Sequence, residues 1–242
     1  MKSKTPSFKT ASNPLTNMPH PTNSSLAAEC RFSAGKVQLL KREGEKPTLT
    51  GYGAVFYKAG DPATEYQLWS DTYERVMAGA FDRALREDDV RSLFNHDSNI
   101  VLGRNRAGTL RLSVDEKGLR YDVTPPDTQL CRDQVLTPID RGDVSGSSFM
   151  FVPLRTVWVE EVRDGRTFYI RQLEECQLWE VGPVVFPAYE GTTAGMRAAS
   201  DLAEVKASLE SYLSGRTKSR DEADAVQVRA DYVRFRNSMA GS

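Results

Sequence analysis

Short segments of β-type composition recur along the chain between residues 49 and 186. Their apolar and β-branched residues are bounded by turn-forming residues, which is typical of strands. The predicted strands are residues 49–56, 90–94, 110–114, 119–123, 148–152, 156–162, 167–173 and 178–186. An Asp164-Gly165 pair between two of them is typical of a hairpin turn. Many short strands with closely spaced turns favour an antiparallel barrel or sandwich.

Two predicted helices interrupt these strands, at about residues 80–86 and 128–137. Pro138 follows near the end of the second one, where proline stops a helix because it lacks the backbone N–H. The expected fold class is therefore mainly β with flanking helices, an α+β protein.

The chain divides into three segments. Residues 1–26 are rich in Ser, Thr, Asn and Pro without a hydrophobic period, so we expect a disordered N-terminal tail. Residues 27–198 form the predicted folded domain. Residues 199–242 form a predicted helical, charged C-terminal tail, in which Leu202, Val205 and Leu209 recur at helical spacing. A second helical stretch is predicted at about residues 221–237.

Composition excludes several classes of partner and site. The formal net charge is −1, so nucleic acid is not expected as the main partner. No apolar run approaches the roughly 18 residues that a membrane-spanning helix needs, and no membrane association is expected. Cys30, Cys131 and Cys176 are odd in number and show no C-x-x-C spacing. They are interpreted as reduced thiols, not as a disulfide framework or a zinc site.

One histidine and a pair of serines are the candidate chemical groups. His96 is the only histidine in the predicted domain, because His20 lies in the predicted tail. Histidine is the usual general base near neutral pH, so activity through His96 is expected to rise with pH at ~6–7. Ser147 and Ser148 begin a predicted strand and point to opposite faces of it. From the residues alone, either serine is a possible nucleophile, and both also fit a purely structural role.

Several sequence blocks, in order, resemble the prohead (capsid-maturation) serine proteases of tailed phages. The blocks are residues 51–56 (GYGAVF), 74–81 (ERVMAGAF), 94–97 (FNHD), 101–104 (VLGR), 108–110 (GTL), 115–119 (DEKGL), 141–149 (RGDVSGSSF) and 179–188 (WEVGPVVFPA). The resemblance covers about residues 48–197. It implies a fold similar to that of the herpesvirus assemblins, an antiparallel β-barrel surrounded by helices.

The resemblance also implies a function. It predicts an endopeptidase in the host cytoplasm, inside the assembling procapsid, that cleaves the scaffold segment of the major capsid protein and then itself. It implies no metal or organic cofactor. We further expect self-association, as a homodimer.

The same resemblance selects among the candidate residues. Its nucleophile is the serine directly before phenylalanine, which is Ser148 here, with His96 as the base. A third group must orient the imidazole. Glu180 is the first candidate, because a carboxylate in an otherwise apolar strand is costly unless it is paired. Asp97 and Asp143 are the alternatives.

Two other functions fit parts of the pattern. One is a non-catalytic assembly module that keeps the protease fold and binds capsid subunits. The other is an esterase, which would need a G-x-S-x-G elbow. The serine motif lacks the second glycine of that elbow.

Overall fold

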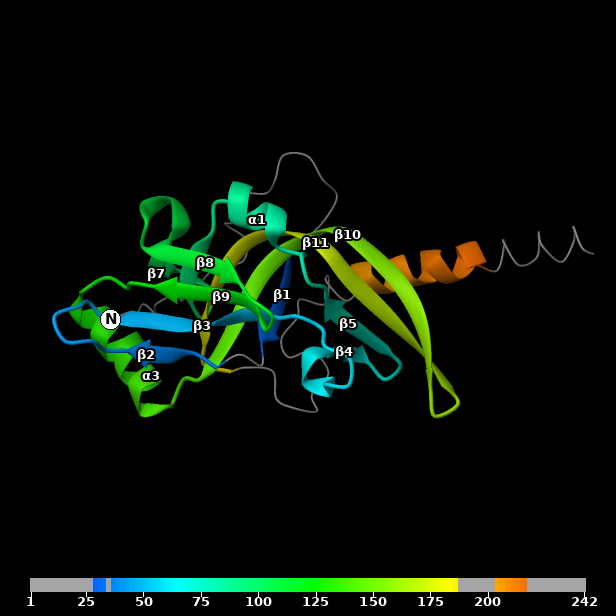
Figure 1. The fold of residues 1–242 in the computed structure, drawn as a ribbon, viewed down its shortest axis with the longest axis horizontal. Helices are drawn as coiled ribbons and strands as arrows, with labels where there is room; N and C mark the ends of the chain where they lie inside the picture. The colour runs from blue at the N-terminus through cyan, green and yellow to red at the C-terminus, as the bar shows by residue number, and fades with distance from the viewer. Residues whose placement is uncertain (1–27, 34–35, 187–202, 217–242) are drawn as a thin grey trace, which may run out of the picture.

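The computed structural model describes residues 28–33, 36–186 and 203–216. Of these residues, 50% lie in strands and 23% in helices (Figure 1). The predicted mainly β, α+β class is therefore confirmed. The predicted N-terminal tail, residues 1–26, and the second predicted helical stretch, 221–237, lie outside the described residues.

The described residues form eleven strands joined by short helical segments. The strands are β1 (Glu29–Ser33), β2 (Gln38–Leu40), β3 (Thr48–Val55), β4 (Tyr66–Trp69), β5 (Thr72–Val76), β6 (Arg91–Phe94), β7 (Asp97–Arg104), β8 (Leu110–Val114), β9 (Gly118–Val123), β10 (Gly146–Arg163) and β11 (Arg166–Val184). The helical segments are η2 (Pro62–Thr64), α1 (Asp82–Glu87), η3 (Asn105–Ala107), α2 (Gln129–Cys131), η4 (Arg132–Leu136), α3 (Thr137–Arg141) and a helix at 203–216.

The strands assemble into two sheets. The larger sheet has the order β1-β10-β11-β5-β4, and β6 joins it beside β11 and carries β7. The smaller sheet is antiparallel, in the order β2-β3-β9-β8. Among the described residues neither sheet closes on itself, so the expected barrel is not confirmed. Strand β11 pairs antiparallel with β10 but parallel with β5 and β6, and the sheet continues to an open edge at β4.

Strands β10 and β11 form one long hairpin that extends away from the rest of the molecule (Figure 1). Four strands were predicted here. The predicted strands 148–152 and 156–162 are parts of β10, and 167–173 and most of 178–186 are parts of β11. Register shifts near Met150 and Arg155 accommodate the irregular stretch around Pro153, so the pairing of β10 with β11 continues through it. The predicted turn is present at Asp164-Gly165, with φ of 51° and 76°.

The hydrophobic core includes side chains from both sheets. Phe149 and Phe151, on one face of β10, stack at 4.9 Å between ring centroids. Phe81, just before α1, packs edge-on against Phe149 at 5.8 Å. Leu119 and Tyr121 of β9 belong to the same buried cluster. This face of β10 is therefore the interior face, and the other face is available for a site.

The predicted second helix continues through proline. Helical residues run from Gln129 to Arg141, and Thr128 caps the start by accepting a hydrogen bond from the Cys131 N–H. The segment before Pro138 is a π-helical turn, η4. Its wider hydrogen-bond spacing accommodates the missing proline N–H, so the helix does not end where predicted.

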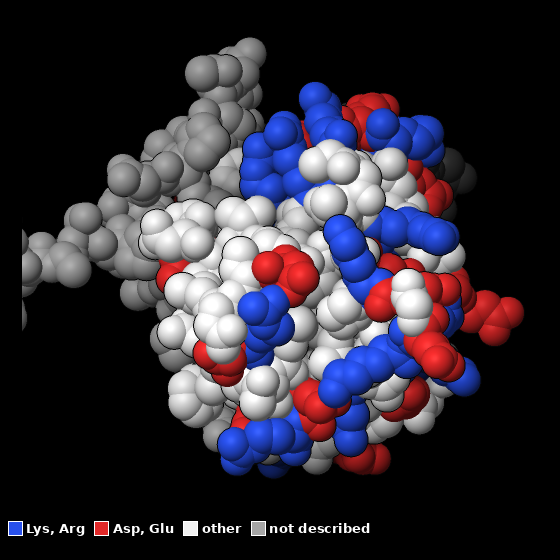
Figure 2. Space-filling model, turned by 90° about the vertical axis from the view of Figure 1, so that its left-hand side faces the viewer, with Lys and Arg blue, Asp and Glu red and all other residues white. Residues whose placement is uncertain are grey.

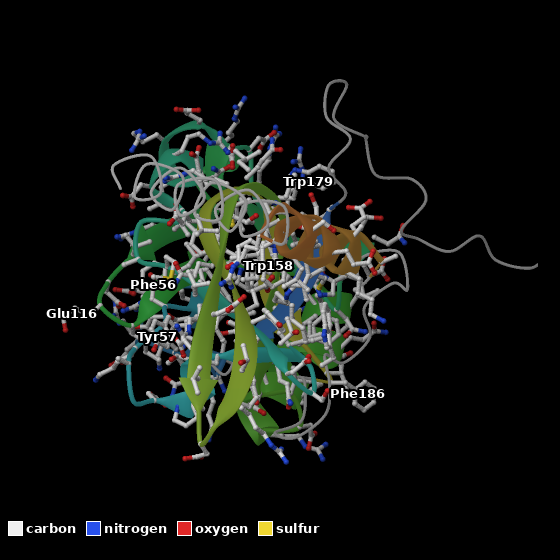
Figure 3. All side chains as sticks on the ribbon, turned by 90° about the vertical axis from the view of Figure 1, so that its right-hand side faces the viewer. Phe56, Tyr57, Glu116, Trp158, Trp179 and Phe186 are labelled. Carbon is white, nitrogen blue, oxygen red and sulfur yellow. The ribbon has the colours of Figure 1, made fainter. Side chains whose placement is uncertain are left out.

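The helix at residues 203–216 packs against the β10–β11 hairpin. Val205 and Leu209 are buried, and the indole Nε1 of Trp158 donates to Ser208 Oγ at 3.0 Å. Figure 3 shows Trp158 beside this helix. Residues 203–216 of the predicted tail are thus helical and contact the sheet, while the domain boundary at residue 198 stays a prediction.

Charges are mixed at the end of the molecule that carries β2, β8 and β9. Figure 2 shows basic and acidic side chains interleaved there. A groove in this region is lined by basic Arg42, Lys46 and Arg111 together with acidic Glu45 and Asp122. It shares no residue with the cluster described next.

Candidate active site

Three neighbouring strands present Cys30, Ser148 and Glu180 on one face of the larger sheet. Cys30 of β1 and Glu180 of β11 both lie opposite Met150 of β10. Directly opposed residues share a face, and side chains alternate along a strand. Cys30, Ser148 and Glu180 therefore lie on the face opposite that of Phe149.

His96 reaches this face from the turn between β6 and β7. Phe94 pairs with Asp97, so Asn95 and His96 form a two-residue hairpin turn, with φ of 57° and 58°. Positive φ at both positions is typical of the tight turns favoured in hairpins. For a histidine this left-handed conformation costs about 1–3 kcal/mol, which the surrounding contacts must offset. The Asn95 N–H donates to Pro183 O at 2.9 Å, which fixes the turn against β11.

A glycine lets β6 approach β11 closely enough to deliver His96. Strand β6 pairs in parallel with β11 at Glu180 and Val181. A Cβ atom added at Gly182 would lie 1.9 Å from the carbonyl oxygen of Leu93 in β6. Any side chain at residue 182 would therefore separate the two strands and move the histidine turn away from Glu180.

The three sequence-predicted residues form one hydrogen-bonded relay. His96 Nε2 lies 2.9 Å from Ser148 Oγ, and His96 Nδ1 lies 3.0 Å from Glu180 Oε2. Ser148 and Glu180 are buried and the imidazole is largely buried. This is the order of groups in a nucleophile–base–acid triad, with both distances within hydrogen-bond reach.

The neighbouring serine has a different environment. Ser147 points to the interior face, where its hydroxyl lies 2.9 Å from the Tyr121 hydroxyl. It is fully buried and is separated from His96 by the sheet. The residue pattern alone does not choose between Ser147 and Ser148 as nucleophile. The structure places them on opposite faces of β10.

The alternative acids are engaged elsewhere. Asp97 Oδ1 accepts hydrogen bonds from the backbone and side-chain amides of Asn99, both at 2.8 Å. Asp143 is exposed and pairs with Arg141 at 3.1 Å. Of the three candidate acids, the structure brings Glu180 to the imidazole.

Cys30 is a member of the cluster that sequence reasoning missed. Its Sγ lies 3.1 Å from His96 Nε2 and 3.3 Å from Ser148 Oγ. The Ser148 hydroxyl also donates to the carbonyl oxygen of Arg31, at 2.8 Å. The one available signal was alternation in the segment Glu29–Ser33, where charged residues alternate with Cys30 and Phe32.

Four charged side chains form a cluster, here called the buried quartet, that anchors β1. Its members are Glu29 and Arg31 of β1, Glu74 of β5 and Arg171 of β11. Arg171 donates to Glu29 and to Glu74 at 2.9 Å, and Arg31 binds the same two carboxylates. Burial alone would lower the pKa of Arg31, but the charges of Glu74 and Glu29 raise it above its ordinary value.

The environment of His96 favours its protonated form. Burial disfavours the imidazolium, but hydrogen bonds to Cys30 and Glu180, and the negative charge of Glu180, outweigh that effect. Together they raise the pKa of His96 to about 10. These contacts therefore make the imidazolium of His96 harder to deprotonate than that of an ordinary histidine.

Comparison with known proteins identifies a family for this chain. The family model of the caudovirus prohead serine proteases matches residues 35–208, which include His96, Ser148 and Glu180. Neither the curated proteins nor the solved structures contain a match. Among the described residues, no helix combines the length and apolar character needed to cross a membrane. Since the family model spans well over half of the sequence, the chain belongs to the caudovirus prohead serine protease family.

Proposed function

We propose that this chain is the serine endopeptidase of capsid maturation, with Ser148 as nucleophile, His96 as general base and Glu180 as the group that orients the imidazole. The observation that carries this proposal is the continuous relay from Ser148 Oγ through both ring nitrogens of His96 to Glu180. Family membership supports the reaction class and the location inside the procapsid.

The geometry supports a two-step acyl transfer. His96 Nε2 takes the hydroxyl proton as Ser148 Oγ attacks the peptide carbonyl, and returns it to the leaving amine. Water then attacks the acyl-enzyme by the same route. Glu180 accepts the Nδ1–H hydrogen bond, which keeps Nε2 as the proton acceptor and stabilises the imidazolium that forms.

The free enzyme must rearrange before this step. Ser148 Oγ is fully buried, and its hydroxyl donates to Arg31 O. A hydroxyl has one proton, so the same group cannot donate to His96 at that moment. Substrate binding must therefore expose Oγ and turn its proton toward Nε2.

The family suggests which substrates to propose. We propose that the enzyme cleaves the scaffold segment of the major capsid protein inside the procapsid, in the host cytoplasm, and later itself. Association with the capsid protein is what the family implies. A homodimer in the procapsid remains part of the proposal.

Co-expression with the cognate capsid protein tests the function. Mass spectrometry of both chains should find new termini in the scaffold segment and in the protease, and none when Ser148→Ala replaces the wild type. Capsid protein that co-purifies uncut with the wild type would contradict the protease proposal and favour a non-catalytic assembly module.

The pH dependence of kcat/KM tests the role of His96. A general base must be unprotonated, and the pKa of His96 is raised above its ordinary value of ~6.5 by its contacts with Cys30 and Glu180. We therefore expect kcat/KM for a capsid-derived peptide to rise with pH, with its midpoint clearly above 7. This expected midpoint of kcat/KM lies above the ~6–7 expected from the sequence for an ordinary histidine. A midpoint at or below 6.5, or a flat profile from pH 6 to 10, would exclude this assignment of the base.

A further inference from the structure

Cys30 lies against both reacting atoms of the proposed triad. Its Sγ is 3.1 Å from His96 Nε2 and 3.3 Å from Ser148 Oγ. Cys30 is the second residue of β1, and its neighbours Glu29 and Arg31 are held in the buried quartet. Unlike Ser148, which is fully buried, Cys30 is partly exposed.

The hydrogen bonds that Ser148 and Cys30 can donate determine which of the two pairs with His96 Nε2. Ser148 has a second acceptor, Arg31 O at 2.8 Å, which is as close as His96 Nε2 at 2.9 Å. For the thiol proton, the nitrogen of His96 is a better acceptor than the Ser148 oxygen. All three groups are satisfied when Cys30 donates to His96 and Ser148 donates to Arg31 O. In that arrangement the serine is not poised for attack.

The thiol differs from the hydroxyl in acidity as well as in position. A thiol is a far stronger acid than an aliphatic alcohol, and a neighbouring imidazolium stabilises the thiolate. Transfer of the proton breaks the S–H bond of Cys30 and forms the Nε2–H bond of His96. It leaves a thiolate next to an imidazolium, and no other reactant is required.

We propose that Cys30 competes with Ser148 for His96 and holds the free site in a resting thiolate–imidazolium pair. The base becomes available to Ser148 when substrate displaces this pair and the proton returns to sulfur. The catalytic consequence rests on the proposed function, whereas the proton exchange between Cys30 and His96 does not.

The charges around the pair favour it. On the same face, Glu180 of β11 holds the other ring nitrogen and stabilises the imidazolium. Ser148 of β10 adds a polar but uncharged neighbour. On the opposite face of β1, Glu29 and Arg31 are compensated within the buried quartet, so they add little net charge next to sulfur.

Two substitutions at Cys30 separate acidity from hydrogen bonding. Cys30→Ala removes both, whereas Cys30→Ser keeps a donor of similar size but removes the acidity. Cys131→Ala is the matched control, because that thiol is buried and lies in α2, not in the larger sheet. Melting curves establish that each variant is folded.

The first measurement is an NMR titration of the histidine ring signals without substrate. The chain has two histidines, so a His20→Gln variant assigns the signal of His96. We expect the His96 midpoint to fall by at least about one pH unit in both Cys30 variants, toward the ordinary value of ~6.5. Cys131→Ala should leave it unchanged. The proposal is overturned if the midpoint is unmoved, or if Cys30→Ser behaves like the wild type.

The second measurement is peptide hydrolysis at pH 7. A base whose midpoint is one unit lower has about tenfold more unprotonated imidazole below both midpoints, so kcat/KM should rise about tenfold in both Cys30 variants. Loss of hydrolysis in folded Cys30→Ser would instead make the thiol the nucleophile and overturn the proposal. If the wild type hydrolyses nothing, the proposed function fails, while the NMR titration still decides the proton exchange.

Discussion

Ser148→Ala is expected to abolish capsid-protein processing while leaving the fold intact. The substitution removes the oxygen that lies 2.9 Å from His96 Nε2, and loss of a triad nucleophile typically lowers kcat by about 10⁴-fold or more. Alanine fits the site, because it deletes one atom and creates no new contact. Peptide hydrolysis and mapping of capsid-protein termini measure the loss, and the melting temperature establishes that the protein is folded.

The adjacent serine provides the control. Ser147→Ala removes the partner of the buried Tyr121 hydroxyl and should lower the free energy of unfolding by about 1–3 kcal/mol. It should retain hydrolysis, because Ser147 lies on the interior face of β10. A dead Ser147→Ala enzyme beside an active Ser148→Ala enzyme would move the nucleophile one residue upstream. Full activity in both would remove this pair from the mechanism.

Glu74→Gln is expected to lower the free energy of unfolding more than Ser147→Ala or Asp140→Asn does. Glutamine keeps the shape of the side chain but leaves Arg31 and Arg171 facing a single carboxylate, Glu29, in the interior. Breaking a buried ion cluster by removing one partner costs about 3–5 kcal/mol, since an uncompensated charge stays buried. Urea denaturation at fixed pH and salt measures the change in free energy of unfolding.

An exposed ion pair gives the matched comparison. Lys41 and Asp140 pair at 2.6 Å with side chains 61% and 48% exposed. Asp140→Asn should change the free energy of unfolding by less than about 1 kcal/mol, because water screens the pair. If Glu74→Gln costs no more than Asp140→Asn, the quartet is hydrated and does not anchor β1.

The site was predictable where the chemistry depends on local sequence. His96 stands alone in the predicted domain, and Ser148 precedes phenylalanine in a recognisable block. Glu180 stood out as a carboxylate in an apolar strand, and the structure places it on the imidazole. Their catalytic roles remain predictions until the variants are measured.

Long-range pairing was much less predictable. The periodicity located the strand segments within 146–184, but it could not show that bulges near Met150 and Arg155 merge them. The parallel pairing of β11 with β5 and β6 depends on segments about 90–100 residues apart, which no local pattern encodes. The expected barrel came from the family resemblance and from the many short strands, which fit a barrel or a sandwich, and neither determines closure.

Cys30 and the buried quartet were missed for a related reason. Glu29, Arg31 and Glu74 resemble exposed charges in sequence, because charged residues are rarely buried without partners. Their partners lie on three different strands, so the compensation appears only in the folded sheet. Cys30 then takes its position from β1, which the sequence patterns did not predict.

The hairpin of β10 and β11 has a consequence for the timing of activity during synthesis. Glu180 is made 84 residues after His96, so the contact between them cannot form earlier. Strand β10, the partner of β1, is made more than a hundred residues after β1. A nascent chain that has not yet emerged beyond β11 cannot hold the relay, and pairing over such separations is slow. The relay of the proposed protease can therefore form only after β11 has been made, so a nascent chain that ends before β11 is expected to be inactive.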